Sequence, residues 1–242
     1  MSATPLNPRD RFHVAMPVFP GITQLDLTGP HEVLSRVPGV EIDLVWKTLE
    51  PIRAQGTGRP GLILTPTATF ESCQRTDMLC VPGGSGCIDI LNDDEVLAAI
   101  ARLGSSARYV TSVCTGSLIL GAAGLLTGYR ATCHWASLPT LETFGATPVA
   151  ERVVIDRNRI TGAGVTSGLD FSLQVISQLW GSRMAEMAQL SLEYDPAPPF
   201  DAGSPRVARP ELVDAMRAAM RPLNEKRDAA IERAAAKLRR PR

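Results

Sequence analysis

The chain has 242 residues, 44% of them hydrophobic, and a balanced charge of 25 Lys/Arg and 25 Asp/Glu. This length fits one α/β domain, or one domain with an appendage, and the apolar content suffices for a substantial core. No apolar run is long enough to cross a bilayer, and the N-terminus lacks the apolar stretch of a signal peptide, so we expect a cytoplasmic protein without a membrane partner. The five cysteines form no Cys-x-x-Cys pair, which argues against a zinc site or a redox pair.

Predicted strands alternate with predicted helices along most of the chain. This alternation predicts a mostly parallel sheet with helices on both faces. The expected elements are a strand at 12–19, a helix at 27–37, a strand at 40–48, a hairpin within 58–70, a strand at 76–84, a helix at 93–107, a strand at 108–113, helices at 116–126 and 134–145, a hairpin at 152–162, and helices at 166–181 and 182–194.

The C-terminal part differs in composition from the rest. We expect an α/β domain at 10–200, followed at 201–242 by a Pro-rich linker and a basic helical extension. Residues 206–242 carry 11 Lys/Arg and five Asp/Glu, a balance that some nucleic-acid-binding tails share. No helix-turn-helix pattern accompanies it, so we interpret the extension as a solvated helix that packs on the core or on a dimer partner, with no nucleic acid bound.

Cys114 lies in the sequence Ser112-Val113-Cys114-Thr115-Gly116, between a predicted strand and a predicted helix. A nucleophile between small flanking residues at this junction is typical of a nucleophile elbow, whose sharp turn exposes the central side chain. The helix N-terminus that follows favours a thiolate. The alternative is that Cys114 is only a small buried apolar residue.

A nucleophilic thiol needs a proton acceptor, and two types of residue are candidates. His134 is the best placed of the three histidines, although its spacing does not require that role. Asp26 follows the first strand, and sites in α/β sheets gather beyond the carboxyl ends of strands. A carboxyl buried there would have a raised pKa and could act as acid and base, whereas an exposed one would only cap the helix.

Two glycine-rich turns complete the candidate site. The loop Gly83-Gly84-Ser85 ends a strand, and its N–H groups, with that of Thr115, could form an oxyanion-type hole. The turn "GAGVTSG" at 162–168 contains Val165 and Thr166 and precedes another helix, so it could line the same pocket. Neither turn has the spacing of a dinucleotide-binding or phosphate-binding loop, and no cofactor or metal is expected.

The motifs "QLDLTGPHEVL", "VPGGSG", "YVTSVCTGSLILGAAGLLTG", "ATCHWA", "GAGVTSGLDFSL" and "LEYDPAPPFDAGSP" together resemble the ThiJ/PfpI superfamily, and within it the isocyanide hydratases. The resemblance extends from about Arg11 to Arg240. Thr115 after the cysteine and Asp26 early in the chain distinguish it from the protease-like and deglycase-like branches, which have a histidine and a glutamate there.

The resemblance implies a flavodoxin-like fold and hydration of an isocyanide, R–N≡C, to an N-substituted formamide. It implies Cys114 as the nucleophile, Asp26 as acid and base, and Thr115 as a residue that shapes the site. It also implies a homodimer, a small-molecule isocyanide substrate, and no metal or organic cofactor. In the chemistry we expect, Cys114 attacks the isocyanide carbon, protonated Asp26 supplies a proton, and ionised Asp26 then activates water.

Three other functions remain possible from the sequence. Similar domains form the sensory half of AraC-type regulators, although the tail here is too short for their DNA-binding units. A thiol-based stress protein, acting as a deglycase or redox sensor, could use the same cysteine. A protease is disfavoured because Thr115 stands where that branch has histidine.

Overall fold

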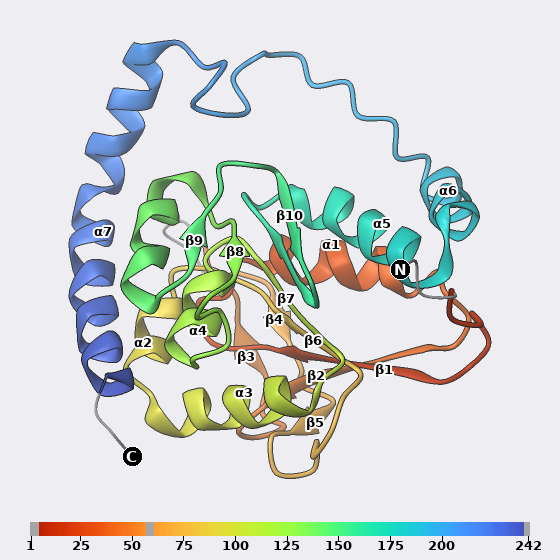
Figure 1. Cartoon of the computed structure of the whole chain (residues 1–242). Coiled ribbons are helices and arrows are strands. Elements are labelled where there is room, and N and C mark those ends of the chain that lie inside the picture. Colours follow the sequence, from red (N-terminus) through yellow and green to blue (C-terminus); the bar gives the residue numbers. More distant parts are fainter. Residues whose placement is uncertain (1–4, 57–60, 240–242) are drawn as a thin grey trace.

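The computed structural model describes residues 5–56 and 61–239, and a seven-stranded sheet organises them (Figure 1). The strand order is β10-β11-β7-β6-β1-β2-β5, and every neighbouring pair is parallel except β10 with β11. These strands are β1 (Phe12–Pro17), β2 (Val40–Trp46), β5 (Ala68–Thr69), β6 (Met78–Val81), β7 (Tyr109–Val113), β10 (Val153–Asp156) and β11 (Arg159–Gly162). The predicted mostly parallel α/β sheet is therefore confirmed.

Helices cover both faces of this sheet (Figure 1). One face carries α1 and α5, which pack against each other, and the other carries α3 and α4. The helices are α1 (Gln24–Leu34), α2 (Cys87–Leu91), α3 (Asp94–Ser106), α4 (Gly116–Ala122), the 3-10 helix η1 (Trp135–Phe144), α5 (Ser167–Trp180), α6 (Ser182–Ser191) and α7 (Pro210–Leu238).

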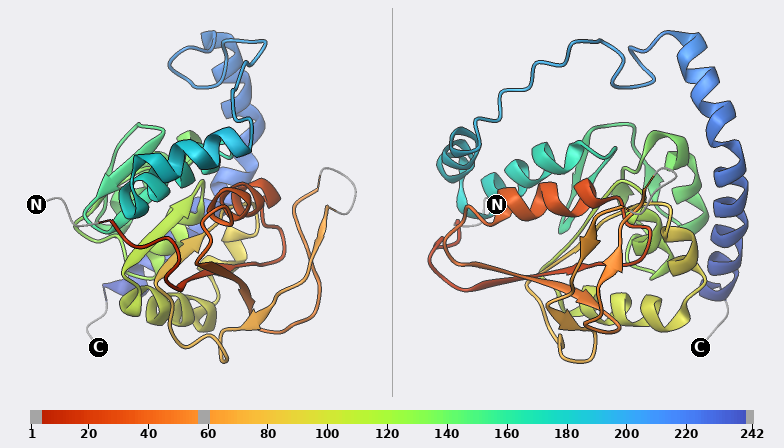
Figure 2. Two further views of the ribbon diagram at one scale, coloured as in Figure 1. Left: turned by 90° about the vertical axis from the view of Figure 1, so that its right-hand side faces the viewer. Right: turned by 180° about the vertical axis from the view of Figure 1, so that it is seen from behind.

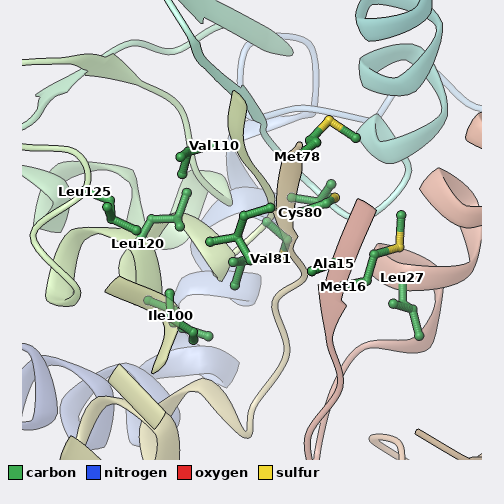
Figure 3. Close-up of a cluster of buried hydrophobic side chains, with 14 of the residues drawn as sticks. Ala15, Met16, Leu27, Met78, Cys80, Val81, Ile100, Val110, Leu120 and Leu125 are labelled. Carbon is green, nitrogen blue, oxygen red and sulfur yellow. The ribbon is translucent and has the colours of Figure 1, made fainter. Parts of the chain in front are cut away.

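The core lies on both sides of the sheet because the strands are buried between two helical layers. In Figure 3, Met16 and Leu27 lie on the side of α1, while Ile100 and Leu120 extend from α3 and α4. All four side chains are at most 2% exposed. This rigid packing fixes the positions of the strand ends, and the carboxyl ends of β1, β6, β7 and β11 lie at one edge of the sheet.

Several elements differ from the prediction. The helix expected at 27–37 is α1, which begins and ends three residues earlier, so that Asp26 lies in its first turn. The helix expected at 134–145 is 3-10, and Pro139 lies inside it. The short helix α2 and the small parallel pair β8 (Arg130–Ala131) and β9 (Thr147–Pro148) were not predicted.

The hairpin expected within 58–70 is wrong. Its first piece, β4 (Ile63–Leu64), pairs with the earlier strand β3 (Ile52–Arg53), and its second piece, β5, joins the central sheet beside β2. Residues 57–60, where this prediction begins, lie outside the described residues. By contrast, the hairpin predicted at 152–162 is confirmed as β10 and β11.

The C-terminal helix α7 has two different halves. Its C-terminal half packs against η1, α2 and α4, and buries Arg227, Ile231 and three alanines. Its N-terminal half, and the segment that joins it to α6, stand away from the core as an arm (Figure 2). We call residues 192–222 the arm. No described helix is both long enough and apolar enough to span a membrane.

Candidate active site

Cys114 occupies a strained turn between β7 and α4. Its φ angle is 58°, a left-handed conformation that costs a non-glycine residue about 1–3 kcal/mol. Its backbone N–H donates to the carbonyl oxygen of Gly162 at 3.0 Å, so the end of β11 supports the turn. A Cβ on Gly116 would lie 2.0 Å from the carbonyl oxygen of Val81, which explains the small residue there. This geometry is that of the nucleophile elbow expected from the sequence.

The carboxyl group of Asp26 lies beside this thiol. Asp26 is fully buried in the first turn of α1, and its Oδ2 accepts a hydrogen bond from the N–H of Gly83 at 3.0 Å. Oδ1 has no well-aligned partner among the described residues, while the Cys114 thiol is close enough to interact with the carboxyl. Burial raises the pKa of Asp26 to about 7, although the hydrogen bonds from Cys114 and Gly83 oppose that rise.

The thiol of Cys114 is not the stabilised thiolate that the helix N-terminus suggested. Burial and the neighbouring Asp26 carboxylate raise its pKa well above the ordinary value, and the N–H of Thr115 opposes this only partly. Cys114 is 5% exposed, so water solvates a negative charge on sulfur poorly. Near neutral pH the Cys114 thiol is therefore protonated, and the Asp26 carboxyl beside it is the group that titrates.

Thr115 connects the elbow to the loop that follows β6. Its Oγ1 accepts a hydrogen bond from the N–H of Gly84 at 2.9 Å and donates to the carbonyl of the same residue at 3.3 Å. Gly84 has a φ of +135°, and a Cβ there would lie 2.4 Å from the backbone nitrogen of Thr23. Only glycine fits this position, so the loop and the elbow hold each other in place.

The predicted oxyanion hole in this loop is wrong in one respect. The N–H groups of Gly83, Gly84 and Ser85 are all occupied, by Asp26, Thr115 and Gln55 respectively. They therefore position the acid and the elbow, and do not point at a ligand. Gln55 was missed, because nothing in its sequence surroundings distinguishes it. Its Oε1 accepts from Ser85 at 3.0 Å.

A cavity of about 470 Å³ is lined by two segments that contact the elbow, the turn after Gly162 and the segment of Cys133. Val165 and Thr166, both expected at the pocket, line it together with Cys133 and His134. The carbonyl of Thr166 accepts a hydrogen bond from Arg152 at 3.0 Å, which fixes the beginning of α5. Phe200 is 79% exposed in the arm and does not line the cavity.

His134 lies in the cavity wall and forms no hydrogen bond with Cys114. Its Nδ1 accepts from the N–H of Ala136 at 3.3 Å, and burial together with the charge of Arg227 lowers its pKa. The ring is therefore neutral at physiological pH. His13 is bound to Asp43 at 3.0 Å on β1 and β2, and takes no part in the site.

Two further cysteines, Cys87 and Cys133, lie close to the site. Cys133 is near enough to Cys114 to raise its pKa, and Cys87 contacts both Thr115 and Arg227. Arg227 donates from Nη1 to Ser137 Oγ at 2.7 Å, and its Nε has no partner among the described residues. The sequence showed no signal for these contacts, because they join separate elements, and those of Arg227 join α7 to residues 90 or more positions earlier.

Comparison with known proteins agrees with this geometry. The model of the DJ-1/PfpI family matches residues 12–178. An isonitrile hydratase of Pseudomonas putida is 52% identical over 91% of this chain and 95% of its own. The HTH-type transcriptional regulator GbdR of Pseudomonas aeruginosa is 32% identical over 74% of this chain. The matched part covers 49% of the length of that regulator.

Solved structures show the same fold. A ThiJ/PfpI family protein from Pseudomonas syringae superimposes with a TM-score of 0.88 at 47% identity, covering 93% of this chain and 92% of its own. DJ-1beta of Drosophila melanogaster has a TM-score of 0.67 at 18% identity, covering 76% and 98%, and so shares the fold. With a strained cysteine elbow, a buried acid and a family match over most of its length, the chain belongs to the DJ-1/PfpI family.

Proposed function

We propose that this protein hydrates isocyanides to N-substituted formamides, with Cys114 as nucleophile and Asp26 as acid and base. The observation that carries the proposal is the buried pair itself: a thiol beside a carboxyl whose pKa is about 7. Such a carboxyl can accept and return a proton near neutral pH. The similarity to an isonitrile hydratase over almost the whole chain supports the same reaction.

In the first step, the sulfur of Cys114 attacks the terminal carbon of R–N≡C. Ionised Asp26 takes the thiol proton as the S–C bond forms and delivers it to the same carbon. The product of this step is a covalent thioimidate, R–N=CH–S–Cys114. The hydrogen bond from Gly83 to Oδ2 leaves Oδ1 as the oxygen that exchanges the proton.

In the second step, water hydrolyses the thioimidate. Asp26, ionised again, accepts a proton from water as the oxygen attacks the carbon, and that proton passes to the nitrogen. The tetrahedral adduct R–NH–CH(OH)–S–Cys114 then loses sulfur to give R–NH–CHO, and the hydroxyl proton returns to the thiol. One carboxyl serves both steps, so the scheme needs no histidine.

The narrow access to Cys114 favours this substrate class. The thiol is 5% exposed, and Cys133, which lies close enough to the thiol to raise its pKa, lines the cavity. An isocyano group is linear, and its reactive carbon is the terminal atom. It can therefore reach a buried thiol that a peptide carbonyl, with substituents on both sides, cannot reach. This argument disfavours the protease among the alternatives.

We further propose a cytoplasmic homodimer. Five free cysteines suit a reducing compartment. Leu190 of α6, Phe200 and Met216 are each at least 50% exposed on or beside the arm, which suits coverage by a second copy. We treat residues 10–200 as the catalytic domain and 201–242 as its extension. Light scattering of the wild type and of Phe200→Asp tests the dimer, which we expect the substitution to weaken.

The decisive experiment is turnover of p-nitrophenyl isocyanide by the reduced protein, with the formamide product identified by mass spectrometry. We expect turnover by the wild type and none by Cys114→Ala, with a trapped thioimidate mass on the wild type only. A folded, reduced wild type without turnover would favour a redox or sensory role. Full turnover by Cys114→Ala would refute the proposed nucleophile.

A further inference from the structure

Two buried polar atoms in the first turns of α1 and α5 have no hydrogen-bond partner among the described residues. They are Oδ1 of Asp26 and Oγ of Ser167, and both residues are 0% exposed. Folded proteins leave few such atoms unpaired, because a buried polar atom without a partner costs free energy. The proposed reaction uses Oδ1 of Asp26 but gives no part to Ser167.

The hydroxyl of Ser167 lies beside the residue that supports the elbow. Its Oγ is 2.8 Å from the position that a Cβ on Gly162 would occupy, so a larger residue there would press on this hydroxyl. The carbonyl of Gly162 accepts the N–H of Cys114 at 3.0 Å. The N–H of Ser167 donates to the carbonyl of Gly164 at 2.9 Å, which fixes the turn that carries the hydroxyl. One residue, Gly162, therefore contacts both Ser167 and Cys114.

The first turn of α5 also contacts the helix that carries the acid. A Cβ on Gly168 would lie 3.0 Å from Cδ of Pro30 and 3.7 Å from Cγ1 of Val113. Pro30 lies one turn after the acid in α1, and Val113 directly precedes Cys114. The residue next to Ser167 therefore touches both the helix of the acid and the strand of the nucleophile.

A serine hydroxyl in this position can hold a water molecule. It offers one proton and two lone pairs, and no described residue pairs with them. A buried water needs at least two polar partners, and Oδ1 of Asp26 can supply the second. From this arrangement we propose that Ser167 and Asp26 together hold the water that hydrolyses the thioimidate. Ser167 is then a further catalytic residue, and this role rests on the proposed hydration.

The water held in this way reacts in the second step. Its oxygen bonds to the carbon of R–N=CH–S–Cys114, while Oδ1 of Asp26 takes one of its protons and delivers it to the nitrogen. The hydroxyl of Ser167 accepts a hydrogen bond from the other O–H of the water, which directs a lone pair of the water at the carbon. The adduct R–NH–CH(OH)–S–Cys114 then releases R–NH–CHO, and the hydroxyl proton returns to the thiol. No water takes part in the first step, so Ser167 has no role there.

The two steps of the reaction separate this role from a structural one. After rapid mixing with p-nitrophenyl isocyanide, intact-protein mass spectrometry measures how fast the thioimidate forms and how fast it disappears. We expect Ser167→Ala to form it within twofold of the wild-type rate and to hydrolyse it at least about tenfold more slowly, because a misplaced reactant is costly. Ser167→Gly also removes the hydroxyl and should show the same split.

The matched control is Ser172→Ala. Ser172 is a second fully buried serine of α5, but its hydroxyl already donates to the carbonyl of Gly168 at 2.7 Å. This variant should form and hydrolyse the thioimidate at wild-type rates. Thermal unfolding shows that each variant is folded, and Ser167→Ala should be at least as stable as Ser172→Ala, since only the latter loses a hydrogen bond.

Each outcome decides the role of Ser167. Hydrolysis slowed in Ser167→Ala but not in Ser172→Ala supports it. Hydrolysis within twofold of the wild type in folded Ser167→Ala, or an equal slowing of both steps, overturns it.

If the wild type forms no thioimidate, the proposed hydration fails, and the S-acetyl adduct of Cys114 made with p-nitrophenyl acetate provides the test. Its hydrolysis needs a water at the same place. Slower loss of the acetyl group in Ser167→Ala than in the wild type supports the water site. Equal rates, or a wild type that releases no acetate from this cysteine, overturn it.

Discussion

The N–H of Gly83 donates to Asp26 Oδ2 at 3.0 Å, and a Cβ on Gly83 would lie 2.9 Å from that same oxygen and 2.5 Å from the nitrogen of Thr115. A side chain at this position would therefore separate the acid from the elbow. We expect Gly83→Ala to lower kcat at least about tenfold, because a small displacement of reacting groups is costly. Steady-state kinetics and thermal unfolding measure the effect.

The matched control for this variant is Gly29→Ala, in the same helix as Asp26. A Cβ there would meet Leu169 at 3.7 Å, an ordinary contact. Alanine is a better helix former than glycine by about 1 kcal/mol, so this variant should be folded and active. Equal activity of Gly83→Ala and Gly29→Ala would contradict the role assigned to the loop.

The rate of hydration should depend on the ionisation of Asp26. In the proposed scheme, ionised Asp26 accepts the thiol proton, so kcat/KM should rise with pH and level off above an apparent pKa near 7. The raised pKa of Cys114 predicts that the plateau continues to well above pH 9. A pH profile from 5 to above 9 tests both expectations, and a flat profile across pH 6 to 8 would count against Asp26 as the base.

The stability of the protein should also depend on the ionisation of Asp26, but it should fall as the pH rises, whereas the rate of hydration rises. The pKa of Asp26 is about 7 in the folded protein and near 3.8 when unfolded, so the folded state binds more protons between these values. The contribution of Asp26 to the free energy of unfolding is therefore complete below about pH 4 and is lost as the pH rises through 7. The loss is on the order of 4 kcal/mol.

Asp26→Asn keeps an acceptor for Gly83 but cannot ionise, so its stability should lack this loss. We expect the wild type to weaken relative to Asp26→Asn between pH 5 and pH 8 in urea unfolding. Parallel stability curves for the two proteins would show that the carboxyl is not perturbed by burial.

Arg227 should matter for stability far more than the other arginines of its helix. Asp26 and Arg227 are the charged side chains that are buried among the described residues, and Arg227 is 4% exposed. Arg227→Met removes the hydrogen bond to Ser137 and leaves that hydroxyl buried without its donor, at a cost of about 1–3 kcal/mol. Arg221→Met, at an exposed position of α7, should change the free energy of unfolding by less than about 0.5 kcal/mol.

Residue patterns predicted the fold and the central pair for physical reasons. The alternation of strands and helices depends on local periodicity, and Cys114 and Asp26 both follow strands whose carboxyl ends a parallel sheet brings to one edge. What the patterns could not show was burial. The helix N-terminus at Cys114 suggested a thiolate, but the neighbours that desolvate it come from distant segments.

The same limit explains the error in the glycine loop and the open choice of partner for the tail. Three free N–H groups were expected at 83–85, but Asp26, Thr115 and Gln55 occupy them from other parts of the chain. The basic tail was expected to pack on the core or on a dimer partner, and its second half packs on the core through Ile231 and its alanines. Composition indicates a helix there without indicating which face meets a partner.

The walls of the cavity and the Cys114–Asp26 pair come from separate stretches of the chain. The pair depends on the ends of β1, β6 and β7, where Gly83, Gly84 and Gly116 tolerate no side chain. The cavity is lined by other segments, with Trp135, Leu138 and Val165 among its apolar side chains. Laboratory evolution of this protein should therefore change which substrate is accepted through a few of the residues that line the cavity. Gly83, Gly84 and Gly116 should stay unchanged in every active variant.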